Sequence, residues 1–475
     1  MVFCEDEDTK RILSCRELKY FGTDGFRGEA NRDLTAMHAY KIGRFLGWYF
    51  SADCRGTRAR IVIGKDTRRS SYMLEYAVAA GLVSSGADAY MLHVTTTPSV
   101  SYVVRGDSFD AGIMITASHN PFYDNGIKVL NSEGEKLDDY KTLLMEAYID
   151  GELSLLGIDG GDIPLAQGDK IGCIYDYVAG RNRYVGYLIS LASNSYKKLK
   201  IGIDSANGAS WNIANSVFSA LGAMTYVIGA EPDGLNVNRD CGSTHIERLR
   251  RLVLENHLDV GFAFDGDSDR CIAVDERGNT VDGDAIIYIL AKRLLSKENL
   301  EDNTVVATVM SNSGFVKSLE KLGVKCVQTA VGDRYVYECM QAHGYSLGGE
   351  QSGHVILKKY ATTGDGILTA IMLCEEMCDQ KSPLSKLYAS LRVYPQYTKN
   401  VRVKDKNSAL SDSVVLGAVE NAEKAVEGRG RVLIRKSGTE PLIRIMVECE
   451  DISLCHSCAE DIALAIKNGG HASEQ

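Results

Sequence analysis

The chain has 475 residues, 45% of them hydrophobic and 24% charged, and its formal net charge at neutral pH is −10. These proportions are ordinary for a globular protein, and a length of about 150 residues per domain predicts roughly three domains, with two or four also compatible. The negative charge argues against nucleic acid or an anionic membrane as a partner, because either would favour a basic face. An anionic small-molecule ligand would need basic groups gathered locally.

The thirteen cysteines are scattered along the chain. Cys374 and Cys378 are close in sequence, as are Cys455 and Cys458, but neither pair has a second pair at metal-ligand spacing nearby. The first residues are too charged for a signal peptide, and no apolar run reaches the roughly 18 residues that a membrane span needs. We therefore expect reduced thiols, no membrane segment and a cytoplasmic location.

Short apolar runs alternate with helical patterns along most of the chain. A helix is expected near 71–85, and a helical segment within 175–195. Strands are predicted at 59–66, 88–94, 109–116, 199–208, 223–229, 258–267, 303–310 and 431–441. Strands that recur after helices of this length are typical of βαβ units, so the predicted class is α/β with mostly parallel sheets.

Candidate domain boundaries lie near 157–170, which is polar and glycine-rich, and near 275–284 and 379–397. The resulting segments are 1–165, 166–277, 278–388 and 389–475. The stretches "IGKDTRRS", "IGIDSANG" and "FAFDGDSD" each end an apolar strand on a turn that contains aspartate. This echo suggests related α/β domains, although such strand ends are common.

The strand at 109–116 runs into "SHNP", which begins at Ser118. Serine in such a turn is ordinary by itself. A hydrolase nucleophile elbow does not fit, because Thr116 and Asn120 occupy the glycine positions of its G-x-S-x-G frame. Ligands bind outside the carboxyl ends of parallel strands, so Ser118 is a candidate that needs further support.

The stretch "FAFDGDSDR" (262–270) carries three alternating carboxylates, Asp265, Asp267 and Asp269. Three carboxylates in one turn repel each other unless a hard cation lies between them, and oxygen ligands suit Mg²⁺ or Ca²⁺. An EF-hand loop is disfavoured because Arg270 takes the place of its sixth-position glycine. The pattern predicts a metal site, with Mg²⁺ favoured.

Two later turns offer groups for a sugar and for a phosphate. "LGGEQSGH" (347–354) places Glu350, Ser352 and His354 at alternate positions, which suits sugar hydroxyl or amine groups but equally fits a surface loop. "RKSGTEPLIR" (435–444) combines hydroxyls, glycine and guanidinium groups, as a phosphate monoester requires. No Walker A or G-x-G-x-x-G sequence supports nucleotide binding.

The four turns "TASHNP", "DGDSDR", "GEQSGH" and "RKSGTEP", in this order, resemble the α-D-phosphohexomutase superfamily, and the resemblance extends from about residue 19 to residue 450. It implies three related mixed-sheet α/β domains and a smaller C-terminal α+β domain around a central cleft. The four segments given above would then carry, in turn, a phosphoserine loop, a metal loop, a sugar-binding loop and a phosphate-binding loop.

The resemblance also assigns roles residue by residue. Ser118 would be the phosphoserine and, with Asp265, Asp267 and Asp269, would bind Mg²⁺. Arg27, Lys128 and Arg270 match basic positions of the superfamily's active site, and Lys128 or His119 would move a proton. Substrate binding would involve Glu350, Ser352, His354, Arg435, Ser437, Gly438, Thr439 and Arg444. Lys128 would need a lowered pKa to act as a base.

Segments 20–31, 233–245 and 331–338 are most similar to the superfamily members that act on glucosamine phosphates. The implied reaction interconverts glucosamine 6-phosphate and glucosamine 1-phosphate, with glucosamine 1,6-bisphosphate as intermediate and activator. Lys436 and Ser268 depart from common residues of the phosphate and metal loops without removing a ligand.

Three alternatives to this reaction stay open. The first is a mutase of glucose or mannose phosphates with the same mechanism, the second a non-catalytic sugar-phosphate binder, and the third a phosphatase. The sequence is compatible with a monomer or a homodimer.

Overall fold

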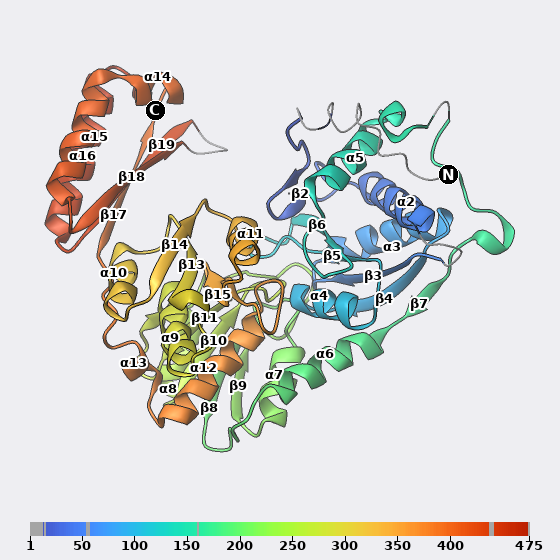
Figure 1. Ribbon diagram of the computed structural model, residues 1–475, viewed down its shortest axis with the longest axis horizontal. Coiled ribbons are helices and arrows are strands. Elements are labelled where there is room, and N and C mark those ends of the chain that lie inside the picture. The colour runs from blue at the N-terminus through green and yellow to red at the C-terminus, as the bar shows by residue number, and fades with distance from the viewer. Residues whose placement is uncertain (1–12, 14–15, 54–57, 159–160, 437–440, 474–475) are drawn as a thin grey trace. The chain divides into compact units, whose positions relative to one another are not determined.

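Four β-sheets with their helices organise the chain, shown as a computed structural model in Figure 1. The structure describes residues 13, 16–53, 58–158, 161–436 and 441–473. The chain forms two compact units: Met1–Val309 with Val327–Ala389, and Met310–Cys326 with Ser390–Gln475.

The first sheet has seven strands in the order β1-β2-β6-β5-β3-β4-β7. Its strands are β1 (Phe21–Gly22), β2 (Gly25–Glu29), β3 (Arg60–Lys65), β4 (Asp88–Val94), β5 (Ala111–Ile115), β6 (Asp124–Asn131) and β7 (Ile174–Asp176). Strands β5, β3, β4 and β7 are parallel, whereas β6 pairs antiparallel with both β5 and β2. Residues 116–123 between β5 and β6 are too few for a parallel crossover, which takes a dozen or more.

Helices cover both faces of this sheet, as Figure 1 shows. They are α2 (Ala36–Asp53), α3 (Arg69–Ser84), α4 (Thr97–Gly106), α5 (Asp139–Asp150) and α6 (Val178–Ser190). Alternate residues of β3 face opposite sides. Ile61 and Ile63 pack in the core with α2, α3 and α5, whereas Val62 packs with Val100 of α4.

The second sheet has the order β12-β11-β10-β8-β9. It comprises β8 (Lys200–Asp204), β9 (Met224–Ile228), β10 (Val260–Phe264), β11 (Cys271–Asp275) and β12 (Thr280–Val281), with helices α7 (Ile213–Ala220) and α8 (Glu247–Glu255). β8 is parallel to β9 and β10, but β10 and β11 form an antiparallel hairpin.

The third sheet has the order β14-β13-β15-β16. Its strands are β13 (Thr304–Thr308), β14 (Lys325–Thr329), β15 (Leu347–Gly349) and β16 (Val355–Leu357). The helices of this part of the sequence are α9 (Gly283–Ser296), α10 (Ser313–Lys321), α11 (Asp333–His343), α12 (Gly366–Gln380) and α13 (Leu384–Leu387).

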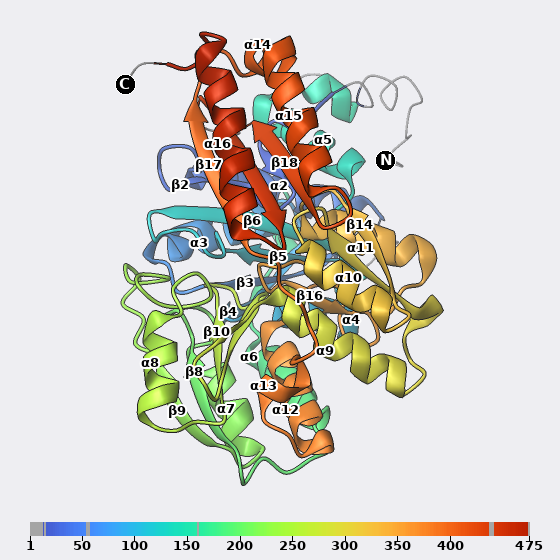
Figure 2. The same ribbon diagram turned by 90° about the vertical axis from the view of Figure 1, so that its left-hand side faces the viewer.

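The fourth sheet is antiparallel, in the order β17-β19-β18. Its elements are β17 (Gln396–Arg402), β18 (Gly430–Lys436), β19 (Leu442–Cys449), α14 (Lys406–Ser411), α15 (Ser413–Val426) and α16 (Ile452–Asn468). Figure 2 shows α15 and α16 on one face of this sheet. Ile443, Ile445 and Val447 point to these helices and form their shared core.

The predicted α/β class, with a smaller C-terminal α+β part, is confirmed, and a strand lies at each predicted position. The expectation of mostly parallel sheets is wrong in detail: β6, β11, β16 and the whole last sheet pair antiparallel. Short connections and hairpins produce these pairs, and the βαβ pattern does not reveal them.

The structure describes ten of the thirteen cysteines, and none of these ten is in a disulfide. Among the helices of the described residues, none is both long and apolar enough to cross a bilayer.

Glu146 of α5 ties down the chain segment that enters β1. Its carboxylate, in a side chain only 5% exposed, accepts hydrogen bonds from three consecutive backbone N–H groups, those of Lys19, Tyr20 and Phe21, at 2.8, 2.7 and 2.8 Å. These bonds fix the approach to the loop before Arg27.

We predict that Glu146→Gln lowers the free energy of unfolding by about 1–3 kcal/mol, because an amide presents its own N–H groups to these donors. Urea denaturation measures the loss. Glu152→Gln is the matched control, since Glu152 forms an exposed ion pair with Arg16, worth at most about 1 kcal/mol. Equal losses in the two variants would contradict the special role of Glu146.

Candidate functional site

Ser118 and Asp265 meet where two sheets end. Ser118 follows β5 and Asp265 follows β10, so both lie beyond the carboxyl ends of strands. The Ser118 hydroxyl donates a hydrogen bond to Asp265 Oδ2 at 2.6 Å, and the serine is 1% exposed. The structure therefore joins the predicted phosphoserine loop to the predicted metal loop.

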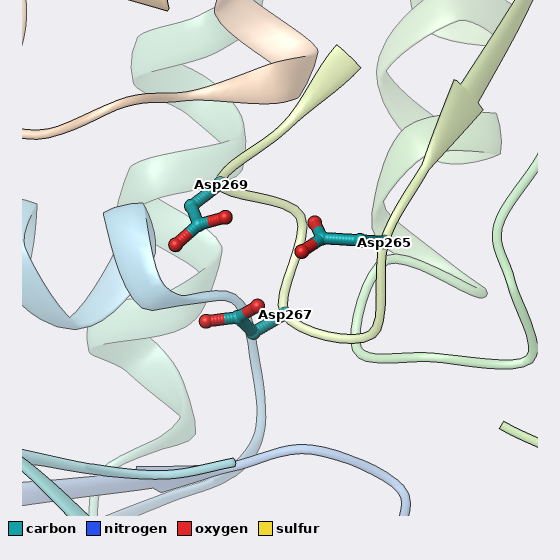
Figure 3. A group of neighbouring side chains, drawn as sticks. All are labelled: Asp265, Asp267 and Asp269. Carbon is teal, nitrogen blue, oxygen red and sulfur yellow. The ribbon is translucent and has the colours of Figure 1, made fainter. Parts of the chain in front are cut away.

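Three carboxylates gather in the turn between β10 and β11, as Figure 3 shows. Asp265, Asp267 and Asp269 are buried and can each offer an oxygen within 4.8 Å of the others. Burial, followed by the charges of Asp269 and Asp267, raises the pKa of Asp265 well above its usual value. Strands flank the turn on both sides, which excludes the helix-loop-helix of an EF-hand.

The same turn contains carboxylate oxygens that are available as metal ligands. Asp267 Oδ1 and Asp269 Oδ1 are buried and accept no hydrogen bond from the described residues. A buried carboxylate oxygen without a partner is costly, and a hard divalent cation satisfies several such oxygens at once. The three aspartates therefore fit Mg²⁺.

Gly266 allows the close approach of the two loops. A Cβ atom at this position would lie 2.4 Å from the backbone oxygen of Ser118. Real Cβ atoms do not approach an oxygen so closely, so a side chain here would push Ser118 away from the aspartates.

Lys128 of β6 reaches the carboxylates from the first sheet. Its Nζ lies 2.7 Å from Asp267 Oδ2 and 3.1 Å from Asp269 Oδ2, and the residue is 4% exposed. Burial alone would lower the pKa of Lys128, but Asp267, Asp269 and Asp24 outweigh it and raise the pKa above its usual value. A general base would need a lowered pKa, whereas these contacts raise the pKa of Lys128.

Two arginines bring donors that the described residues leave unused. Arg27 Nε and Arg270 Nε are buried and donate no hydrogen bond to the described part of the chain. Arg270 Nε lies 4.0 Å from Asp265 Oδ2, and an Arg27 terminal nitrogen lies 3.3 Å from Asp24 Oδ2. Such guanidinium groups suit phosphate oxygens.

His119 lies beside the Ser118 hydroxyl, with its Nδ1 3.4 Å from Ser118 Oγ. Burial, with the positive charges of Arg270 and Arg27, lowers the pKa of His119 to about 4. The ring is therefore neutral at pH 7 and able to accept a proton.

The predicted sugar loop links β15 to β16. Glu350 accepts a hydrogen bond from the Gly332 backbone N–H at 3.1 Å, and Ser352 is exposed. His354, by contrast, is 2% exposed, with Nδ1 3.7 Å from Asp269 Oδ1 and Nε2 accepting from Gly364 N–H at 2.9 Å. The histidine thus lies against the metal loop.

The predicted phosphate loop belongs to the second unit. Arg435 and Arg444 are direct cross-strand partners, so their side chains share one face of the sheet. Like charges placed opposite each other are destabilising unless an anion lies between them, and Arg444 Nε is buried without a hydrogen-bond acceptor among the described residues. Ser437, Gly438 and Thr439 lie outside the described residues.

Thr97 contacts the metal loop, although the sequence motifs did not predict this contact. Its hydroxyl donates to Asp267 Oδ2 at 2.5 Å and its backbone N–H donates to Asp267 O at 3.0 Å. Thr97 follows β4 closely, so a search beyond the end of every predicted strand could have found it.

We predict that Asp267→Asn weakens Mg²⁺ binding at least about tenfold, because it replaces a charged ligand by an amide. Isothermal titration calorimetry with MgCl₂ measures the affinity. Asp240→Asn, an exposed substitution in the same domain, should leave it unchanged. Unchanged affinity in Asp267→Asn would remove this residue from the metal site.

Four family models match the chain in order. The models for domains I, II, III and IV of phosphoglucomutase/phosphomannomutase match residues 18–154, 182–278, 282–394 and 399–465. Among solved structures, a phosphoglucomutase/phosphomannomutase family protein of Burkholderia thailandensis has a TM-score of 0.76 at 21% identity, over 96% of this chain and 98% of that one. The N-acetylphosphoglucosamine mutase of Aspergillus fumigatus, solved with GlcNAc-6P and magnesium, has a TM-score of 0.61 at 15% identity, over 98% and 99%.

Curated relatives are much closer in sequence. A phosphoglucosamine mutase of Lachnospira eligens is 56% identical over 454 residues, which are 96% of this chain and 99% of the relative. That of Bacillus subtilis is 46% identical over 450 residues, covering 95% and 98%. With four family domains in order and relatives this similar over nearly their full length, the chain belongs to the phosphoglucomutase/phosphomannomutase family of the α-D-phosphohexomutases.

Proposed function

We propose that the chain interconverts glucosamine 6-phosphate and glucosamine 1-phosphate. The observation that carries the proposal is the Ser118 hydroxyl, held 2.6 Å from Asp265 Oδ2 in a cluster of three buried carboxylates. A serine in this setting suits a phosphate ester bound to a cation. The amino sugar is supported by the relatives at 46–56% identity, which are named phosphoglucosamine mutases.

An enzyme-held phosphate solves a geometric problem of the substrate. O1 and O6 lie on opposite sides of the sugar, so a phosphoryl group does not pass directly between them. In the proposed first step, the bond between phosphorus and Ser118 Oγ breaks and a bond from phosphorus to the oxygen of the free sugar hydroxyl forms. A base accepts the proton of that hydroxyl, and Ser118 Oγ takes up a proton to become a hydroxyl again. The resulting 1,6-bisphosphate turns around and returns its other phosphoryl group to Ser118 Oγ.

The chain's own residues supply positions and charges for both transfers. Asp265, Asp267 and Asp269, with the phosphate of Ser118, would hold Mg²⁺, and the bound ion supplies Lewis-acid stabilisation of the negative charge on the phosphoryl group. The free donors of Arg27 and Arg270 would bind phosphoryl oxygens.

Of the two candidate proton carriers, neutral His119 is the better acceptor. Its Nδ1 lies 3.4 Å from Ser118 Oγ, the atom that the phosphoryl group would leave. Lys128, protonated and paired with Asp267 and Asp269, is better suited to neutralising charge.

The intermediate must bind in two orientations, so the groups that hold it must tolerate both. We assign Arg435, Ser437, Gly438, Thr439 and Arg444 to the phosphate that is not being transferred. Glu350, Ser352 and His354 are assigned to the sugar, as hydrogen-bonding groups that accept either pose. Glucosamine 1,6-bisphosphate would act as activator, the cytoplasm is the proposed location, and both monomer and homodimer fit the proposal.

We expect the purified chain, with Mg²⁺ and a trace of sugar bisphosphate, to turn over glucosamine 6-phosphate faster than glucose or mannose phosphates. Ser118→Ala should lose at least about 1,000-fold in kcat, because it removes the nucleophile. Ser216→Ala, on the exposed surface of α7, is the control. A coupled assay for each sugar 1-phosphate measures the rates.

Other results of this assay would indicate one of the three alternative functions. Activity mainly on neutral sugars would keep the mechanism and change the substrate. Steady release of inorganic phosphate would indicate a phosphatase, and binding without turnover a sugar-phosphate binding protein.

We expect Arg435→Ala to raise KM for glucosamine 6-phosphate about tenfold with a smaller change in kcat, because a contact equal in ground and transition states affects binding alone. Lys436→Ala removes the same charge from the next residue, whose side chain alternates to the other face and contacts Asn407. Steady-state kinetics of the two variants provide the comparison. A large fall in kcat at unchanged KM would contradict this role for Arg435.

A further inference from the structure

Ser118 has a backbone conformation that serine rarely adopts. Its φ is 51°, in the left-handed region that L residues other than asparagine and aspartate avoid. Such a conformation persists only where the surroundings impose it. The contacts of the Ser118 backbone therefore show which residues set the direction of its hydroxyl.

Arg68 holds the carbonyl side of the loop. It is completely buried, and one terminal nitrogen donates to Ser118 O at 2.9 Å and to Asn120 O at 2.8 Å. The other terminal nitrogen donates to Asp124 O at 3.0 Å and also to Pro121 O. One guanidinium thus spans the turn from the serine to the start of β6.

Asn238 reaches the same carbonyls from the domain that carries the metal loop. Its Nδ2 donates to Ser118 O at 2.8 Å and to Asn120 O at 3.0 Å. Asn238 is 8% exposed and itself left-handed, with φ 57°. Two side chains from different domains therefore converge on one pair of carbonyl oxygens.

The N–H side of Ser118 is fixed as well. Its backbone N–H donates to Thr116 Oγ1 at 2.9 Å, and that hydroxyl donates to Asp66 Oδ2 at 2.8 Å. Asp66 Oδ2 also accepts from Arg68 Nε at 2.8 Å, so the two sides of the loop share one buried carboxylate.

We propose that Arg68 and Asn238 are positioning residues for phosphoryl transfer: they hold the Ser118 backbone in its left-handed conformation and so direct Oγ at the metal loop. This rests on the proposed function. The two side chains bind the carbonyl oxygens of the loop and leave the Ser118 hydroxyl to Asp265. Their loss should therefore misdirect the nucleophile while the sugar and phosphate ligands stay in place.

Asn238→Asp and Asn238→Gly test the proposal, because both tolerate a left-handed backbone and both remove the amide donor. We expect kcat for glucosamine 6-phosphate to fall about 10- to 100-fold, with KM within about twofold of wild type. Arg68→Lys keeps the positive charge but loses the two terminal nitrogens of the guanidinium group, so it should also lower kcat. Asn236→Asp is the matched control, since its amide donates to Glu231 O and not to the loop.

A purely structural role would lower the melting temperature and the active fraction, and the apparent loss of kcat would then equal the loss of folded protein. Wild-type kcat in both Asn238 variants, or a kcat loss that only follows the loss of folded protein, would overturn the proposal. A crystal structure of Asn238→Asp gives a readout independent of activity. If the wild-type chain is inactive on every hexose phosphate, the proposed function fails. The crystal structure of Asn238→Asp then decides the positioning role separately. That role fails if Ser118 keeps its φ and its contact with Asp265 in this variant.

Discussion

The rest of the site depends on the repulsion among three buried carboxylates. Asp265, Asp267 and Asp269 offer oxygens within 4.8 Å of one another in a turn that the β10–β11 hairpin closes tightly. Such a cluster is stable only with positive charge around it. Lys128 and Arg270 supply part of that charge, and the aspartate oxygens that accept no hydrogen bond from the described residues leave a place for a divalent cation. The proposed phosphate on Ser118 would add negative charge to a region that already contains positive charge.

Sheet topology determines which residues share this environment. Ser118 follows β5, Asp265 follows β10 and Glu350 follows β15, so three sheets each contribute the residues beyond a strand end. Gly266 and the left-handed Ser118 let the first two loops touch. The phosphate loop differs: two arginines face each other across antiparallel strands, a pairing that favours an anion between them.

Much of the fold and of the site was predictable from the sequence, because apolar strands end at motifs whose residue types match a chemistry. Ser118, the three aspartates, Glu350, Arg270, Arg435 and Arg444 stand in such motifs, whereas Arg27 was assigned only through the family resemblance. The antiparallel β6 was not predictable from the βαβ rhythm, since a short connection reverses the chain there. The roles of Thr97, Arg68 and Asn238 were not predictable from the sequence, because their contacts with the two loops form only on folding. The raised pKa of Lys128 likewise depends on carboxylates far away in sequence.

The central claim is that the phosphoryl group passes through Ser118. A single-turnover experiment tests it most directly: protein carrying radiolabelled phosphate on Ser118 is mixed with excess unlabelled glucosamine 6-phosphate and Mg²⁺, and the label is followed in time. Our account predicts that the label leaves the protein and appears in the sugar bisphosphate and then in sugar monophosphates. Label that stays on Ser118 while glucosamine 1-phosphate forms, or that is released as inorganic phosphate, would contradict it.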